Sequence, residues 1–224
     1  MVEDYLSDRE QEEALRNWWR DNWRWIIGGI ALGVALLFGW FQWQDYRAAR
    51  GQNAAQQFAE VTAAVAARDA DKAAKELGEI TAEHGSSPYA QEARLMVAKL
   101  HVDAAKYDEA LALLRTVAEK SEDPELANVA KLRAARVLIQ QGKHDEAIAA
   151  LKVDELGAFA GNAHEIRGDA YVAKNDQTAA RAEYAAALAA TDAQIDRGLL
   201  ELKLAEAGGS ASAPAATATP EGQP

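Results

Sequence analysis

The chain contains no cysteine among its 224 residues. This absence excludes a disulfide scaffold, a cysteine-ligated zinc site and a thiol nucleophile. Basic residues are also scarce, because 24 lysines and arginines face 35 aspartates and glutamates, which gives a formal charge of −11. Since binding to phosphate needs a basic surface, we expect no nucleic-acid partner.

Tryptophan is absent from residues 44–224, and all six tryptophans lie in one 26-residue window. Residues 25–44 of this window carry no charge, and residues 25–41 are an unbroken apolar or glycine run. A membrane-spanning helix needs roughly 20 such residues, and tryptophan rings settle at the two headgroup levels. The sequence therefore predicts a transmembrane helix over residues 25–44, with six membrane-interface residues: Trp18, Trp19, Trp23, Trp25, Trp40 and Trp43.

A buried core helix or a cleaved signal peptide could also contain a long apolar run. A core helix rarely carries tryptophans at both ends, and it rarely runs for 20 positions without a charged residue. A signal peptide has an apolar region of roughly 7–15 residues followed by small residues. Here the run continues into the bulky Trp40, Phe41 and Trp43. We therefore expect the helix to be retained.

Positive charge near the predicted span sets its orientation. Arg9, Arg16, Arg20 and Arg24 precede the span, whereas Arg47 and Arg50 follow it. Because basic residues favour the cytoplasmic side, we expect residues 1–24 to be a cytoplasmic tail and residues 45–207 to be exported.

Small residues recur within the span at the spacing of helix–helix contacts. Gly29 and Gly33 form a GxxxG motif, and Ala35 and Gly39 extend the pattern. Such residues let a second helix approach closely, although glycine and alanine are common in spans without a partner. These four residues are our candidates for packing within the membrane.

The remaining chain is rich in helix-forming residues and poor in helix breakers. Residues 51–207 contain 42 alanines and two prolines, Pro88 and Pro124. No stretch alternates polar and apolar residues at period two. We therefore predict an all-α fold, with residues 45–207 as one repeat domain.

Internal repeats divide this domain. The segment that starts at Ala105 (AKYDEALALL) returns at Gly142 (GKHDEAIAAL), and a weaker copy starts at Lys174. Small residues open the second helix of each unit at Ala110, Ala147 and Ala180, and an earlier degenerate unit places Ala73 there. This period and the helix–turn–helix pattern resemble tetratricopeptide repeats. A last helix over residues 191–207, with Ile195, Leu199 and Leu202 on its packing face, is expected to cap the stack.

The repeats also contain small positions that resemble those of tetratricopeptide units, Ala98, Ala135 and Gly168. We interpret these as core positions where the second helix crosses the first. In such a stack the first helix of each pair lines the concave face. The candidate binding residues on this face, some of which could instead pack against a neighbouring helix, are Leu95, Lys99, Val102, Leu132, Arg136, Ile139, Asp169 and Val172.

Motifs for catalysis, cofactors or metals are missing from the sequence. The four histidines lie in different repeats at no metal-ligand spacing, and no nucleotide-binding glycine pattern is present. The carboxylate pairs Asp108–Glu109 and Asp145–Glu146 recur in repeat register near helix starts, where they favour the helix dipole. We therefore expect no enzyme activity, no cofactor and no metal. Residues 208–224 are expected to be a disordered tail rich in proline and alanine.

The approach to the span (EALRNWWRDN, residues 13–22), residues 132–137 (LRAARV) and residues 166–171 (IRGDAY) resemble the YfgM family. Members of this family are ancillary subunits of the bacterial SecYEG translocon. The resemblance implies a bacterial inner-membrane protein with a periplasmic repeat domain and with membrane lipid around its span. It also implies a chaperone-like role, in which the protein works beside the periplasmic chaperone PpiD and contacts translocating polypeptides. The residues themselves leave a second hypothesis open, a membrane-tethered repeat scaffold for another cell-envelope complex.

Overall fold

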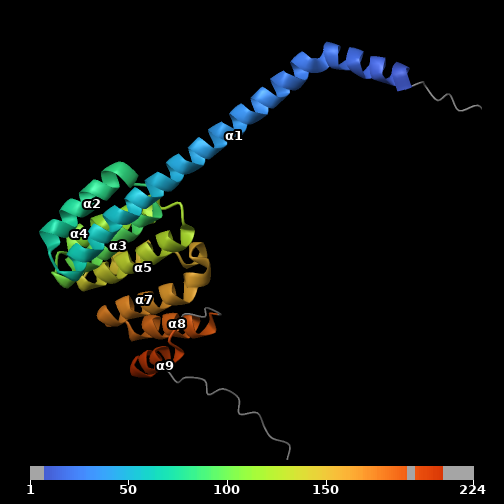
Figure 1. Cartoon of the computed structure of the whole chain (residues 1–224). Coiled ribbons are helices and arrows are strands. Elements are labelled where there is room, and N and C mark those ends of the chain that lie inside the picture. Colours follow the sequence, from blue (N-terminus) through green and yellow to red (C-terminus); the bar gives the residue numbers. More distant parts are fainter. Residues whose placement is uncertain (1–7, 191–194, 209–224) are drawn as a thin grey trace, which may run out of the picture. The chain divides into compact units, whose positions relative to one another are not determined.

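The computed structural model describes residues 8–190 and 195–208, in which every regular element is a helix (Figure 1). This confirms the predicted all-α fold. The α-helices are α1 (Asp8–Ala66), α2 (Ala70–His84), α3 (Pro88–Asp103), α4 (Tyr107–Lys120), α5 (Pro124–Gln140), α6 (His144–Ala150), α7 (Ala160–Ala173), α8 (Gln177–Ala189) and α9 (Arg197–Glu206). Two 3₁₀ turns, η1 (Val153–Glu155) and η2 (Gly157–Phe159), join α6 to α7.

The chain divides into two units, Met1–Asn53 and Ala54–Pro224. The described part of the first unit is helix α1, which passes without a break through the predicted span. In the part of the chain that the structure describes, one helix is long and apolar enough to cross a membrane, and none of its most apolar window is buried. Leu36 and Phe38, for example, are 66% and 69% exposed. A soluble core helix would be buried, so the structure does not support a core helix here.

The second unit is a stack of helical hairpins. The residues of α1 from Ala54 onward share a buried cluster with α2 and α3, and from α2 to α9 each helix packs against the next. The small residue that opens the second helix of each hairpin is almost fully buried in all four units, at Ala73, Ala110, Ala147 and Ala180. The predicted repeats, including the degenerate first one, are confirmed.

Residue sizes are matched in the last hairpin. In every unit, a first-helix residue and the residue sixteen positions later, in the second helix or directly after it, are both buried. The later residue is leucine in three units, where its partner is valine or alanine, and tyrosine in the last unit, where its partner is glycine. The pairs are Val61 and Leu77, Ala98 and Leu114, Ala135 and Leu151, and Gly168 and Tyr184. In the last pair a methyl group on Gly168 would lie 2.4 Å from the Tyr184 ring. The largest second-helix residue is thus accommodated by the smallest first-helix residue.

The turns between paired helices also repeat. A residue with positive φ stands at the same place in each, at Arg68, Ala105, Gly142 and Asn175. This conformation costs little for glycine, and asparagine tolerates it better than most residues. Helices α3 and α5 each start with a proline at the first position, where the missing N–H is not needed.

Polar contacts connect one turn to the next. Asp108 accepts a hydrogen bond from Gln141 at 2.9 Å, and Asp145, its counterpart in the following repeat, pairs with Lys174. Each aspartate lies in the first turn of its helix, Asp108 in α4 and Asp145 in α6. The aspartate of each carboxylate pair therefore links its repeat to the next one.

The last helix is shorter than expected and packs on another face. Helix α9 begins at Arg197, and residues 191–194 and 209–224, which include most of the expected tail, lie outside the described residues. Its buried residues are Leu200 and Leu204, whereas Leu199 and Leu202 are 45% and 64% exposed. Ile195 packs against the same buried cluster, but the prediction was wrong for Leu199 and Leu202. Both sets are spaced as i and i+3 or i+4, so periodicity alone did not distinguish them.

Candidate functional site

Three adjoining hollows lie along the first helices of the repeats, α3, α5 and α7. We call them together the first-helix groove. The first hollow, of about 310 Å³, lies between α3 and α5, and its lining residues are Leu95, Ala98, Lys99, Val102, Leu114, Arg133, Arg136 and Val137. It shares Val102, Arg136 and Val137 with the second hollow, of about 450 Å³, which adds Tyr107, Ile139, Gln140 and Asp169. Asp169 also lines the third, of about 400 Å³, with Val172, Gln177, Tyr184, Lys203, Glu206 and Ala207.

The structure brings together seven of the eight candidate binding residues in this groove: Leu95, Lys99, Val102, Arg136, Ile139, Asp169 and Val172. Leu132 is 5% exposed and belongs to the main hydrophobic cluster. For this residue the alternative holds that it packs against neighbouring helices. That the groove binds a ligand stays a prediction.

Several groove residues were not predicted. Arg133 follows Leu132 directly and lines the first hollow, and Val137 lies one helical turn further along α5. An i, i+4 search from Arg133 would have found this second residue. Tyr184 and Lys203 come from α8 and α9, and no sequence periodicity relates them to the first helices.

The α3–α5 end of the groove is basic. Lys99 pairs with Asp103 at 2.9 Å. Arg133 and Arg136 are exposed, and neither makes a hydrogen bond or ion pair within the described residues. The floor between them is formed by aliphatic side chains such as Leu95 and Val137. This end therefore offers an apolar surface beside two guanidinium groups that remain available for a ligand.

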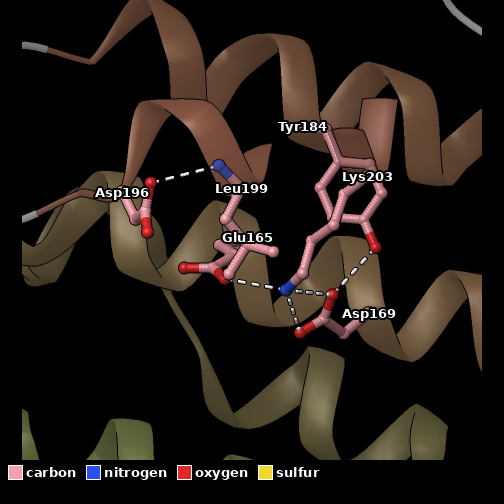
Figure 2. Close-up of polar contacts among 6 residues, drawn as sticks. All are labelled: Glu165, Asp169, Tyr184, Asp196, Leu199 and Lys203. Carbon is pink, nitrogen blue, oxygen red and sulfur yellow. Dashed lines mark hydrogen bonds and ion pairs between the residues drawn. The ribbon is translucent and has the colours of Figure 1, made fainter. Parts of the chain in front are cut away.

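The α7–α9 end holds a network of four polar side chains (Figure 2). The Lys203 ammonium donates to Glu165 Oε1 at 2.7 Å and to both oxygens of Asp169 at 2.8 and 2.9 Å. The Tyr184 hydroxyl donates to Asp169 Oδ1 at 2.8 Å. The network joins α7, α8 and α9, so it anchors the last helix to the stack.

Protonation of this network follows from its contacts. Burial lowers the pKa of Lys203, but its hydrogen bonds to Asp169 and Glu165 outweigh burial, and the net pKa is raised. Burial is also the main cause that raises the pKa of Tyr184 far above its usual value, with the hydrogen bond to Asp169 next. Lysine is therefore held charged and tyrosine neutral throughout the physiological pH range.

A second network links α7 to α8 and to the residue that follows α6. Glu183 pairs with His164 Nδ1 at 2.7 Å and with Arg167 at 2.8 Å. Arg167 also donates to the Leu151 carbonyl at 3.3 Å. His144 starts α6 as Tyr107 starts α4. Within the described residues no three metal-ligand side chains come together.

In the first unit the predicted interface tryptophans are exposed along α1. The Trp40 and Trp43 rings lie 5.4 Å apart, and the Arg47 guanidinium lies 4.7 Å from the Trp43 ring. A methyl group on Gly29, Gly33 or Gly39 would meet nothing within 4 Å. Gly29 and Gly33, one helical turn apart, form a small-residue face that therefore has open space beside it in this chain.

Comparison with known proteins gives matches over nearly the whole chain. A family model described as a tetratricopeptide repeat-like domain matches residues 16–209. The protein named "Ancillary SecYEG translocon subunit" of Haemophilus influenzae is 28% identical over 201 residues, which cover 89% of this chain and 98% of the relative. Proteins with the same name from Aggregatibacter actinomycetemcomitans and Escherichia coli are 27% and 26% identical, over 89% and 83% of this chain and 95% and 89% of their own lengths.

Proposed function

Since the chain belongs to the tetratricopeptide repeat-like family matched over residues 16–209, and with its named relatives to the YfgM family, we propose that it is an ancillary subunit of the SecYEG translocon. One observation carries this proposal. The similarity includes the apolar part of α1 as well as the repeats, so it extends to the anchor and not only to a common repeat fold.

The apolar part of α1 supports the proposal that the protein is anchored in a membrane. Residues 25–44 would span the bacterial inner membrane, with residues 1–24 in the cytoplasm and the repeat domain of residues 45–207 in the periplasm. Helix α1 continues from the span into the first repeat, so the boundary near residue 45 would lie within a helix. Gly29 and Gly33, which lie on one open face of α1, would dock on a translocon helix, and Ala35 and Gly39 would offer a second small-residue contact on another face of the span.

The first-helix groove supports a role in handling polypeptides. It offers adjoining hollows of about 310 to 450 Å³, lined by aliphatic side chains with a few charged groups at the rim. Such a surface can hold an extended or helical segment, and it offers no constellation of side chains typical of catalysis. We infer a non-enzymatic, chaperone-like factor that acts beside PpiD on polypeptides that leave the translocon.

A membrane-tethered scaffold for another cell-envelope complex is the alternative. The repeats would serve it equally well, because a groove of this kind can hold a segment of a folded partner. The two functions differ in what the anchor touches.

Photo-reactive residues at Gly29 and Gly33 test the choice in intact cells. We expect ultraviolet light to give adducts with translocon subunits, because both positions lie on the small-residue face. Ala31 is the matched control, since it lies about 200° around the helix from each of them, and it should give much weaker adducts. Adducts at Gly29 and Gly33 with cell-wall or outer-membrane assembly proteins alone would favour the scaffold and refute the translocon function.

A further inference from the structure

Charge changes sign along the first-helix groove. In the three later units, the residue that follows the small core position lines the groove. It is Lys99 in the α3 unit, Arg136 in the α5 unit and Asp169 in the α7 unit. Because these positions are equivalent in the repeats, the stack itself aligns them in one row from basic to acidic.

The basic end of the groove has positive charges that are not paired within the described residues. Lys99 is paired with Asp103, whereas Arg133 and Arg136, one helical turn apart on α5, make no polar contact within the described residues. They stand out in a domain with an acidic excess, since residues 51–207 contain 18 basic and 26 acidic residues. Solvated arginines are common on protein surfaces, but here both line one apolar hollow.

The opposite end has an excess of negative charge. Glu165 and Asp169 share a single ammonium group, that of Lys203, and Glu206 lines the same hollow. A segment lying along the groove therefore meets net positive charge over α3 and α5 and net negative charge over α7 to α9.

We propose that the groove binds apolar polypeptide segments that carry carboxylates at the end lying over Arg133 and Arg136. This rests on the proposed function, in which the groove receives unfolded polypeptide. Guanidinium groups bind carboxylates through two parallel hydrogen bonds, and the apolar floor lowers the competition from water. The same end repels a lysine-flanked segment, so the groove selects both the composition and the direction of the chain.

Peptide binding to the full chain in nanodiscs of zwitterionic lipid tests this proposal. Three fluorescent peptides share one apolar body of leucine, valine and alanine, and differ in two residues at one end, which are glutamate, glutamine or lysine. We expect the glutamate peptide to bind about fivefold more tightly than the glutamine peptide, and the lysine peptide to bind most weakly. High salt should reduce the difference.

The Arg133→Gln/Arg136→Gln variant tests whether the two arginines cause the ranking of the three peptides. It should bind the three peptides with similar affinity, because the charge that ranks them is removed, and it should stay folded, because neither arginine makes a polar contact within the described residues. Arg115→Gln, an exposed arginine on α4 outside the groove, is the matched control and should keep the full ranking. Equal binding of all peptides by the unsubstituted protein would overturn the charge selection alone. If no peptide binds, both this selection and the polypeptide-binding function are refuted.

Discussion

Alanine in place of Gly168 is expected to lower the free energy of unfolding by about 2 to 3 kcal/mol, the cost of overpacking a close-packed core. The added methyl group would lie 2.4 and 2.6 Å from two carbons of the Tyr184 ring. The ring is 2% exposed and is fixed by its hydroxyl, which donates to Asp169. It therefore has little room to move, and α8 would have to shift away from α7.

A second substitution tests whether the contact with Tyr184 causes the loss of stability in Gly168→Ala. Gly168→Ala/Tyr184→Leu reproduces the alanine–leucine pairs of the two preceding repeats, so alanine should cost much less in the leucine background. Gly78→Ala on α2 is the matched control, because a methyl group there meets nothing and helix propensity favours alanine by about 1 kcal/mol. Urea unfolding of the full chain in detergent, followed by circular dichroism, measures these variants beside the unsubstituted protein and Tyr184→Leu alone. An equal loss from Gly168→Ala in both backgrounds would contradict the size-matching account.

The sequence predicted these packing positions because a repeat imposes the same steric demand several times. Ala110 and Ala147 stand in nearly identical segments, so the repeat itself marks the buried register. The pairing of Gly168 with Tyr184 could be recognised once the units were aligned. Seven of the eight candidate groove residues lie together for the same reason.

Methionine in place of Lys203 is expected to cost about 2 kcal/mol. Methionine keeps most of the apolar stem, but it leaves Glu165 and Asp169, 14% and 34% exposed, without their counter-charge. Loss of one partner of a buried pair costs about 3 to 5 kcal/mol, and partial exposure reduces this. Helix α9 should then fray first, which hydrogen exchange at Leu200 and Leu204 would detect.

Two comparisons separate the effect of the Lys203 charge on stability from the effect of its packing. Lys152→Met breaks an ion pair with Glu155 whose side chains are 70% and 61% exposed, and it should cost less than about 0.5 kcal/mol. In a Glu165→Gln/Asp169→Asn background, Lys203→Met should cost little, since no carboxylate is left unpaired. A full loss in that background would show that packing of the lysine stem, and not charge, holds α9.

The same network makes the free energy of unfolding depend on pH, with a loss at high pH. Both Lys203 and Tyr184 have a raised pKa in the folded protein, so folding holds their protons more tightly than the unfolded chain does. Their contribution is complete below the unfolded values, about 10, and decreases as the pH rises above them. The Lys203→Met variant should therefore lose less stability than the unsubstituted protein between about pH 9 and 11, which urea unfolding at each pH measures.

This network was beyond the reach of sequence reasoning for a physical reason. Lys203 lies 34 and 38 residues from its two partners, and it joins the cap helix to a repeat rather than one repeat to the next. A pair formed once leaves no periodic pattern. The packing face of α9 was wrong for a related reason, because two apolar rows fit one amphipathic helix, and the structure buries the row that brings Lys203 to Asp169.

An anchored repeat domain that holds emerging polypeptide in its first-helix groove should crosslink to that polypeptide from groove positions. Photo-reactive residues at Gln140 and Val172, both lining the groove, test this directly in cells that carry a secretory chain arrested in the translocon. We expect adducts with the arrested chain from both positions and none from the matched control at Arg115. Adducts of equal yield from all three positions, or none from the groove, would contradict it.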